Sequence, residues 1–405
     1  MKFNIWKDCP KVPITELLSF IVDNRGKTVP TADDGWKLIA TNCVTNNTLF
    51  PVYEKVRYLT QETYETWFRA HPIPGDILFV NKGTPGRVCM VPDPVDFCIA
   101  QDMIALRADD EKIYNKYLFA VLRSREIQQQ IYNTNVGDVI PHFKKQFMDQ
   151  LLIPVPDRMI QEIIGNLYYE LSYKTELNKK INENLEQQIE TILLKTIDNA
   201  NTQPVKLGDY LYIKGRIGWK GLKKSEYLPV SNYRIINGES LTLSGIDWNK
   251  AGYISAERYE ESPEIMLNIG DILLSKDGTI GKIGYVDKLE TPTSVASGIF
   301  VIRNTRQAEI STQFIYYLLK SRLFKAFITS RTEGSVIPHL YQKDFTEFEF
   351  QLPSPDDMKT FDDTTAAMFS MVFSNLNENE RLIHLRDSLL PKLMSGELDI
   401  SGIEI

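Results

Sequence analysis

The sequence predicts an α+β protein: two similar mixed α/β domains joined by two long antiparallel coiled-coil helices, arranged as a dumbbell with an approximate two-fold axis. The first observation is an internal repeat, because residues 75–91 and 270–286 are identical at eight of seventeen positions. Average composition would give roughly one identity. The second observation is that each copy lies among short β-like runs, and the third is that each leads into a long segment with helical periodicity.

The repeat has the size of a domain. The offset between its copies is 195 residues at Gly75 and Gly270, and 197 residues where Gly137 returns as Gly334. An offset that stays nearly constant over sixty residues indicates a duplicated domain and excludes a short solenoid unit. We therefore expect four parts, which are a first domain, a spacer helix, a second domain, and a second helix with a C-terminal tail: residues 1–156, 157–203, 204–355 and 356–405.

Short β runs separated by Gly, Pro and Asn fill each repeated domain. In the first domain the apolar or alternating runs are Trp36–Ala40, Asp76–Val80, Val88–Val91 and Ile99–Leu106. One segment in each domain has the period of a helix instead, and we expect a single helix over Asn115–Gln130 and another over Thr312–Ile328.

Long helices are predicted where the paired prolines end each domain. From Asp157 to about Thr196, and again from Asp356 to about Leu393, apolar residues recur at spacings of three and four, which is typical of a coiled-coil seam. Forty helical residues reach about 60 Å, which exceeds the width of a 150-residue domain. The alternative is two amphipathic helices, each packed on its own domain. If the first helix leads away from the first domain, the second returns along it antiparallel.

Composition points to an intracellular protein. The four cysteines form no Cys-x-x-Cys pair and read as reduced thiols. The first residues lack the apolar run of a signal peptide, and no stretch is long and apolar enough to span a bilayer, so we expect a cytoplasmic protein without membrane contact.

The formal charge of −7 is concentrated in the predicted helices. Residues 1–156 carry 18 basic and 18 acidic side chains, and residues 204–355 carry 19 and 17. A nearly neutral domain permits a local basic face without requiring one.

No set of residues with the pattern of a catalytic or metal site is found. The four histidines are scattered without a supporting carboxylate or cysteine cluster, and the Asn/Asp-Pro-Pro-aromatic signature of methyl transfer is absent. The P-loop-like segment 23–28 has Ile21 where the first glycine is required. We therefore expect no catalytic residue, no metal and no cofactor.

Basic and aromatic residues gather on the predicted loops, where contacts to phosphates and base edges are usually built. For any single residue, a solvated surface charge is the alternative. The candidate DNA-binding residues are Arg25, Lys27, Lys82, Arg87, Lys144, Lys145, Arg216, Trp219, Lys220, Lys223, Lys224, Lys276 and Lys282.

Together these features resemble the DNA-specificity (S) subunit of type I restriction-modification systems. The resemblance covers essentially the whole chain. It is carried by the Gly-Asp-Ile-Leu and Gly-Thr-x-Gly segments at 75–86 and 270–281, the Gly-x-Val-Ile-Pro-His segments at 137–142 and 334–339, and the proline exits into long helices.

The resemblance implies that each repeated domain is a target-recognition domain that reads one half of a bipartite site in double-stranded DNA. It also implies that the helices set the gap and dock two methyltransferase (M) subunits, that restriction (R) subunits join the full complex, and that the S subunit has no active site. Asn81-Lys82 in the first copy corresponds to Lys276-Asp277 in the second, so a contact made by one lysine is not automatically present in the other copy.

Two other functions stay open at this point. A stand-alone modification enzyme would transfer methyl groups from S-adenosylmethionine to DNA by itself. A coiled-coil structural adaptor would have no affinity for DNA, and binding measured across a salt series separates it from a specificity subunit.

Overall fold

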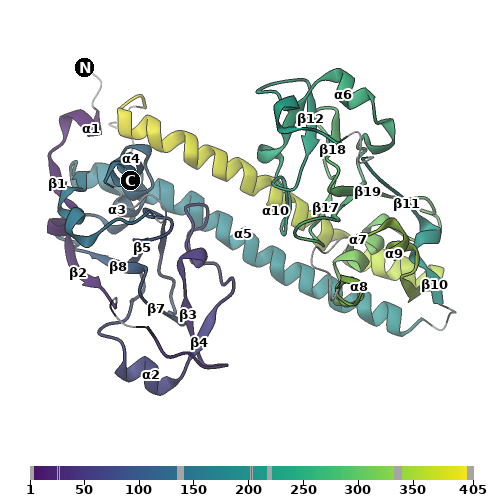
Figure 1. Ribbon diagram of the computed structural model, residues 1–405, viewed down its shortest axis with the longest axis horizontal. Coiled ribbons are helices and arrows are strands. Elements are labelled where there is room, and N and C mark those ends of the chain that lie inside the picture. The colour runs from purple at the N-terminus through teal and green to yellow at the C-terminus, as the bar shows by residue number, and fades with distance from the viewer. Residues whose placement is uncertain are drawn as a thin grey trace. The chain divides into compact units, whose positions relative to one another are not determined.

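The computed structural model describes residues 4–24, 26, 28–134, 141–200, 202, 204–216, 221–332 and 340–398 (Figure 1). The chain forms two compact units. Unit 1 consists of residues 1–180 and 375–405, and unit 2 consists of residues 181–374. The long helices α5 (Arg158–Asp198) and α10 (Pro355–Ser395) each contribute one half to either unit.

Unit 1 is built on a four-stranded antiparallel sheet with the strand order β2-β8-β5-β6. A second sheet has the order β4-β3-β7, in which β3 and β7 run parallel, and β1 pairs with β9. The strands are β1 (Lys11–Pro13), β2 (Leu18–Val22), β3 (Trp36–Ile39), β4 (Arg57–Leu59), β5 (Ile77–Val80), β6 (Val88–Met90), β7 (Phe97–Ile99), β8 (Met103–Ala108) and β9 (Leu152–Pro154). The helices are α1 (Ile5–Asp8), α2 (Gln61–Thr66), α3 (Asn115–Leu122) and α4 (Arg125–Asn133).

Strand β5 is buried on both faces, which explains its uninterrupted apolar sequence. Ile77 and Phe79 lie in a core that contains α3, while Leu78 and Val80 lie in a separate core with Ile39 and neighbouring β7 residues. Alternate residues of a strand point to opposite faces of its sheet. The central strand of unit 1 therefore joins two hydrophobic cores.

Unit 2 repeats this topology, with sheet orders β11-β19-β16-β17 and β15-β12-β18 and the pair β10-β20. A short hairpin, β13-β14, is an addition in this unit. The strands are β10 (Pro204–Lys206), β11 (Leu211–Gly215), β12 (Tyr233–Ile236), β13 (Leu241–Thr242), β14 (Gly245–Ile246), β15 (Gly252–Ile254), β16 (Ile272–Ser275), β17 (Ile283–Tyr285), β18 (Thr293–Val295), β19 (Ile299–Asn304) and β20 (Glu349–Gln351). The helices are α6 (Ala256–Glu260), α7 (Thr312–Lys320), α8 (Arg322–Thr332) and α9 (Gln342–Thr346).

The single helix predicted in each domain was wrong, because each is broken in two. Ser124 lies between α3 and α4; its hydroxyl donates to the Val121 carbonyl (2.6 Å) and accepts from the Ile127 amide (3.4 Å). Ser321 makes the same two contacts between α7 and α8. Serine at an N-cap satisfies an amide that the helix leaves free, so it ends one helix and begins the next.

The two long helices pack antiparallel in unit 1, as predicted. The guanidinium of Arg386 lies 5.5 Å from the Tyr168 ring, and further along α5 the Asn178 amide donates to Asn379 Oδ1 at 2.9 Å. Asn178 and Asn379 thus form a buried amide pair between the two helices.

The duplication extends to the contacts between the helices. In unit 1 the Asn379 amide donates to the Thr175 carbonyl (3.3 Å), and in unit 2 the Asn182 amide donates to the Val372 carbonyl (3.0 Å). The two donors are 197 residues apart, as are the two acceptors. Each unit therefore holds a copy of one asparagine-to-backbone contact. Within the described ranges, no helix is both long enough and apolar enough to cross a membrane.

Candidate nucleic-acid interface

The Gly-Asp segment of the first repeat builds a buried ion pair under the loops of unit 1. Gly75 has a φ of +87°, a left-handed conformation that glycine adopts without steric cost. The next residue, Asp76, is 2% exposed, and its carboxylate accepts from the Ile73 amide (3.0 Å). Arg107 of β8 donates to both of its oxygens at 2.9 and 3.0 Å. This bidentate bond raises the pKa of Arg107 and ties the start of β5 to β8.

The same ion pair occurs in unit 2. Gly270 has a φ of +91°, and the Asp271 carboxylate accepts from the Asn268 amide at 2.8 Å. Arg303 of β19 donates to it at 2.7 and 3.0 Å, and this bond raises the pKa of Arg303. The Gly-Asp-Ile-Leu repeat therefore encodes a structural frame, which we call the ion-pair frame.

Loops of unit 1 converge at the end of β5. The backbone amide of Lys82 donates to the Asp102 carbonyl (3.3 Å), and the Gly83 amide donates to the Pro141 carbonyl (3.0 Å). The Asn81 carbonyl accepts from the Phe143 amide at 2.8 Å. The β5–β6 loop is thus held against the segment that begins at residue 141.

The candidate DNA-binding residues of unit 1 differ from one another in exposure. Lys82 and Lys144 are exposed, and Arg87 is partly buried. Lys145 is exposed, and its ammonium lies 3.4 Å from the carboxylate of Asp23. Asp23 directly follows β2. Arg25 and Lys27 lie outside the described residues. The loop after β5 and the segment 141–145 therefore bring Lys82, Lys144 and Lys145 to one region of unit 1.

The candidates of unit 2 are more scattered. Lys223 and Lys224 are exposed beside a one-turn 3-10 helix (Lys224–Glu226). Lys276 is partly buried with its ammonium 4.9 Å from the Phe300 ring, and Lys282 donates to the Gly238 carbonyl at 2.8 Å. Trp219 and Lys220 lie outside the described part of the chain.

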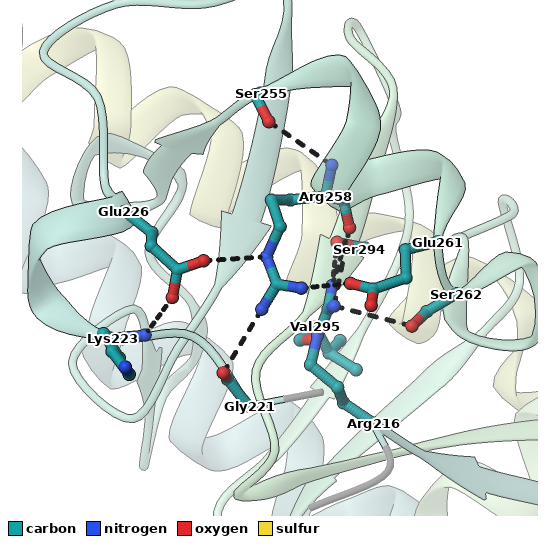
Figure 2. A network of polar contacts seen from close by, with 10 residues as sticks. All are labelled: Arg216, Gly221, Lys223, Glu226, Ser255, Arg258, Glu261, Ser262, Ser294 and Val295. Carbon is teal, nitrogen blue, oxygen red and sulfur yellow. Dashed lines mark hydrogen bonds and ion pairs between the residues drawn. The ribbon is translucent and has the colours of Figure 1, made fainter. Parts of the chain in front are cut away.

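Arg216 is not a surface residue, which contradicts its selection as a DNA contact. It is 2% exposed, and its guanidinium donates to the Val295 carbonyl (3.2 Å) and to the Ser294 hydroxyl (3.3 Å) (Figure 2). Burial lowers its pKa, as does the nearby charge of Arg258. Because Arg216 is buried and its guanidinium is hydrogen-bonded within unit 2, it stabilises the fold of this unit and does not face DNA.

Three charged residues that organise this region were not predicted from the sequence. Arg107 and Arg303 lie 31 and 32 residues after the repeated aspartates, and a comparison of the two copies at that spacing would have found them. Arg258 of α6 pairs with Glu226 and Glu261, and no repeat marks it.

Within the described residues, no group of three or more His, Cys, Asp or Glu side chains is placed to hold a metal ion.

Comparison with known proteins agrees with this architecture. The sequence profile of the family described as "Type I restriction modification DNA specificity domain" matches residues 14–187 and 199–383. The chain belongs to this family. The two matched stretches cover most of the chain, so this specificity subunit carries two copies of the family domain.

Curated relatives carry the same designation. The type I restriction enzyme MjaVIII specificity subunit of Methanocaldococcus jannaschii is 20% identical over 339 residues, which is 75% of either chain. The HindI specificity subunit of Haemophilus influenzae is 31% identical over 161 residues, which is 40% of this chain and 31% of the relative. The crystal structure of a type I restriction-modification S subunit from M. genitalium has a TM-score of 0.55 and 18% identity, covering 97% of this chain and 98% of that one. This last likeness supports the fold.

Proposed function

We propose that this specificity subunit reads a bipartite site in double-stranded DNA, with each repeated domain recognising one half. The observation that carries the proposal is the ion-pair frame, which is duplicated while the loops it supports differ in sequence. A shared frame with different loops is what two different half-sites require, since base readout depends on the side chains that reach the groove.

We also propose that the chain is not catalytic and directs a partner methyltransferase. Two M subunits would dock on α5 and α10, whose acidic character suits protein contact better than DNA contact, and R subunits would join the full complex. The absence of a methyl-transfer signature from the sequence supports this division of labour.

Methyl transfer tests the proposal. The purified chain, incubated with labelled S-adenosylmethionine and DNA, should transfer no label. The same chain with its M subunits should methylate DNA at a bipartite motif. Transfer by the isolated chain would contradict the proposal, as would a complex that shows no sequence preference.

The helices are proposed to set the gap between the half-sites. Inserting four residues near Glu186 adds about 6 Å of helix and little more than one turn. Because base pairs are spaced about 3.4 Å apart, the methylated motif should keep both halves with a gap one or two base pairs longer. An active variant that retained the original gap would contradict this role.

A further inference from the structure

A basic segment of unit 2, residues 221–226, ends in a one-turn 3-10 helix (Lys224–Glu226). The Lys223 amide donates to the Glu226 carboxylate at 2.7 Å, and the Glu226 amide donates to the Lys223 carbonyl at 3.0 Å. Among the described residues, no acidic side chain pairs with the ammonium groups of Lys223 and Lys224, and both side chains are exposed. Two cations therefore face solvent on a single turn.

Arg258 connects both ends of this segment to α6, as Figure 2 shows. Its guanidinium donates to the Gly221 carbonyl at 3.2 Å and pairs through Nε with Glu226 Oε1 at 3.1 Å. It also pairs with Glu261 on the far side. One planar guanidinium thus reaches the first and last residues of the segment, which an ammonium group cannot do.

Arg258 is itself held from behind. Its amide donates to the Ser255 hydroxyl at 3.3 Å, and its carbonyl accepts from the buried Arg216 at 3.4 and 3.5 Å. Arg216 also donates to Val295 of β18. A continuous set of polar contacts therefore runs from the β15-β12-β18 sheet through both arginines to the lysine segment.

This arrangement orders the segment before any ligand arrives. A loop that is ordered only on binding loses affinity, because its side chains give up conformational freedom in the complex. The two glutamates partly neutralise Arg258, so its charge is committed within the unit. The charges left facing solvent are those of the two lysines.

We propose that Arg258 is a positioning residue that holds segment 221–226 so that Lys223 and Lys224 meet phosphates of the DNA backbone. The proposal rests on the proposed function, because it assigns to one loop of unit 2 a contact with the DNA that this unit reads. Arg258 acts through the lysines and makes no contact with DNA.

The test compares variants of the full chain, assembled with its M subunits, in DNA binding across a salt series. Replacing both lysines by alanine should lower the salt slope by about two, one for each lost phosphate contact. Arg258→Gln should weaken binding by about tenfold, as expected when one or two side chains must be ordered on binding. In the combined variant, Arg258→Gln should add little, since the groups it positions are gone.

Two further variants separate positioning from charge and from folding. Arg258→Lys keeps the charge but cannot span the segment, so it should bind as weakly as Arg258→Gln. Glu226→Gln loosens one end while Arg258 keeps its contacts to Arg216, and it should weaken binding in the same direction. Arg306, which also pairs with a glutamate three residues later, gives the matched control, and Arg306→Gln should bind like the unchanged protein.

The outcomes distinguish the two proposals. If the unchanged complex does not bind DNA, the proposed function fails. If the unchanged complex binds and Arg258→Gln binds equally well, only the positioning role fails. Full recovery by Arg258→Lys, or an effect that adds completely to loss of the lysines, would also overturn it.

Discussion

Unit 1 and unit 2 share the ion-pair frame, but they hold the segment after the first strand of that sheet with different side chains. In unit 1 the buried Asn24 donates to the carbonyls of Ala70 and Ile99 and accepts from the amides of Arg69 and Ala70. In unit 2 the guanidinium of the buried Arg216 donates to the carbonyls of Arg258 in α6 and Val295 in β18. The short amide of Asn24 and the long guanidinium side chain of Arg216 thus each anchor the segment after the first strand of the sheet.

The two units agree in the middle of the sheet and differ at its edge. The aspartate–arginine pairs support β5 and β16 in the middle of each sheet, and their loss would disturb every neighbouring strand. Strands β2 and β11, which precede Asn24 and Arg216, lie at the edges of these sheets. We infer that the frame is fixed by folding and that the loops are free to diverge toward different half-sites.

The largest effect is expected from breaking the frame. Arg107→Ala should destabilise unit 1 and Arg303→Ala unit 2, each by about 3 kcal/mol, because a buried carboxylate loses its partner. Hydrogen exchange of the β5 and β16 amides would measure the two units separately. Lys112→Ala, which removes an exposed pair with Asp109, should change stability far less, because solvent screens an exposed ion pair. Unequal effects of Arg107→Ala and Arg303→Ala would show that the two ion pairs do not contribute equally to the stability of their units.

The second effect concerns the residues that differ. Asn24→Ala should loosen unit 1 alone and Arg216→Ala unit 2 alone, by about 2 kcal/mol each, because several buried polar groups lose their partners. The same exchange measurement, read at β7 and β18, would report the change. Asn24→Asp serves as the sharper variant, since a carboxylate cannot donate to the Ala70 and Ile99 carbonyls. An Asn24→Asp variant as stable as the unchanged protein would contradict the role assigned to the Asn24 amide.

The features that the duplication repeats could be predicted from the sequence, and those present in one unit alone could not. The doubled domains and the long helices were predictable, because duplication and helical periodicity leave repeated patterns in the chain. The ion-pair frame was half visible: the Gly-Asp segments were found, but their arginine partners lie more than thirty residues away on another strand. Arg216 was misjudged because a basic residue beside a loop has the same local sequence whether it is buried or exposed. Arg258 had no repeated counterpart to reveal it.

A third effect is expected in DNA binding. Replacing Lys82 and Arg87 by alanine in unit 1, or Lys223 and Lys224 in unit 2, should weaken binding to all sequences alike. Either change should flatten the salt dependence by about one unit per lost phosphate contact. Binding of the full complex across a salt series measures this. An unchanged slope for either pair would identify those residues as ordinary surface charges.

The smallest effect is a difference in acid sensitivity. His71 in unit 1 is stacked on Tyr64 with ring centroids 3.9 Å apart, and its Nε2 contacts the Tyr64 carbonyl at 3.0 Å. Burial lowers the pKa of His71. The folded state therefore binds its proton less readily than the unfolded chain, whose histidine titrates near pH 6.5. Stability from this site is present above about pH 6.5 and is lost as the pH falls toward the lower folded value.

Unit 2 has Met266 at the position equivalent to His71. Exchange at pH 5 and pH 7.5 should thus show a small loss of protection near α2 and none attributable to the equivalent site near α6. His71→Met should abolish the difference in unit 1. If the variant kept the same pH response, another group would be responsible.

If each repeated domain reads its own half of the DNA site, replacing the second domain by a copy of the first must change one half-site and leave the other unchanged. Residues 204–355 would be replaced by a second copy of residues 1–156, and the complex with M subunits would be used to map methylated sites. We expect a motif whose two halves have the same sequence, that of the half-site read by the first domain. A motif that retained the original second half-site would contradict it.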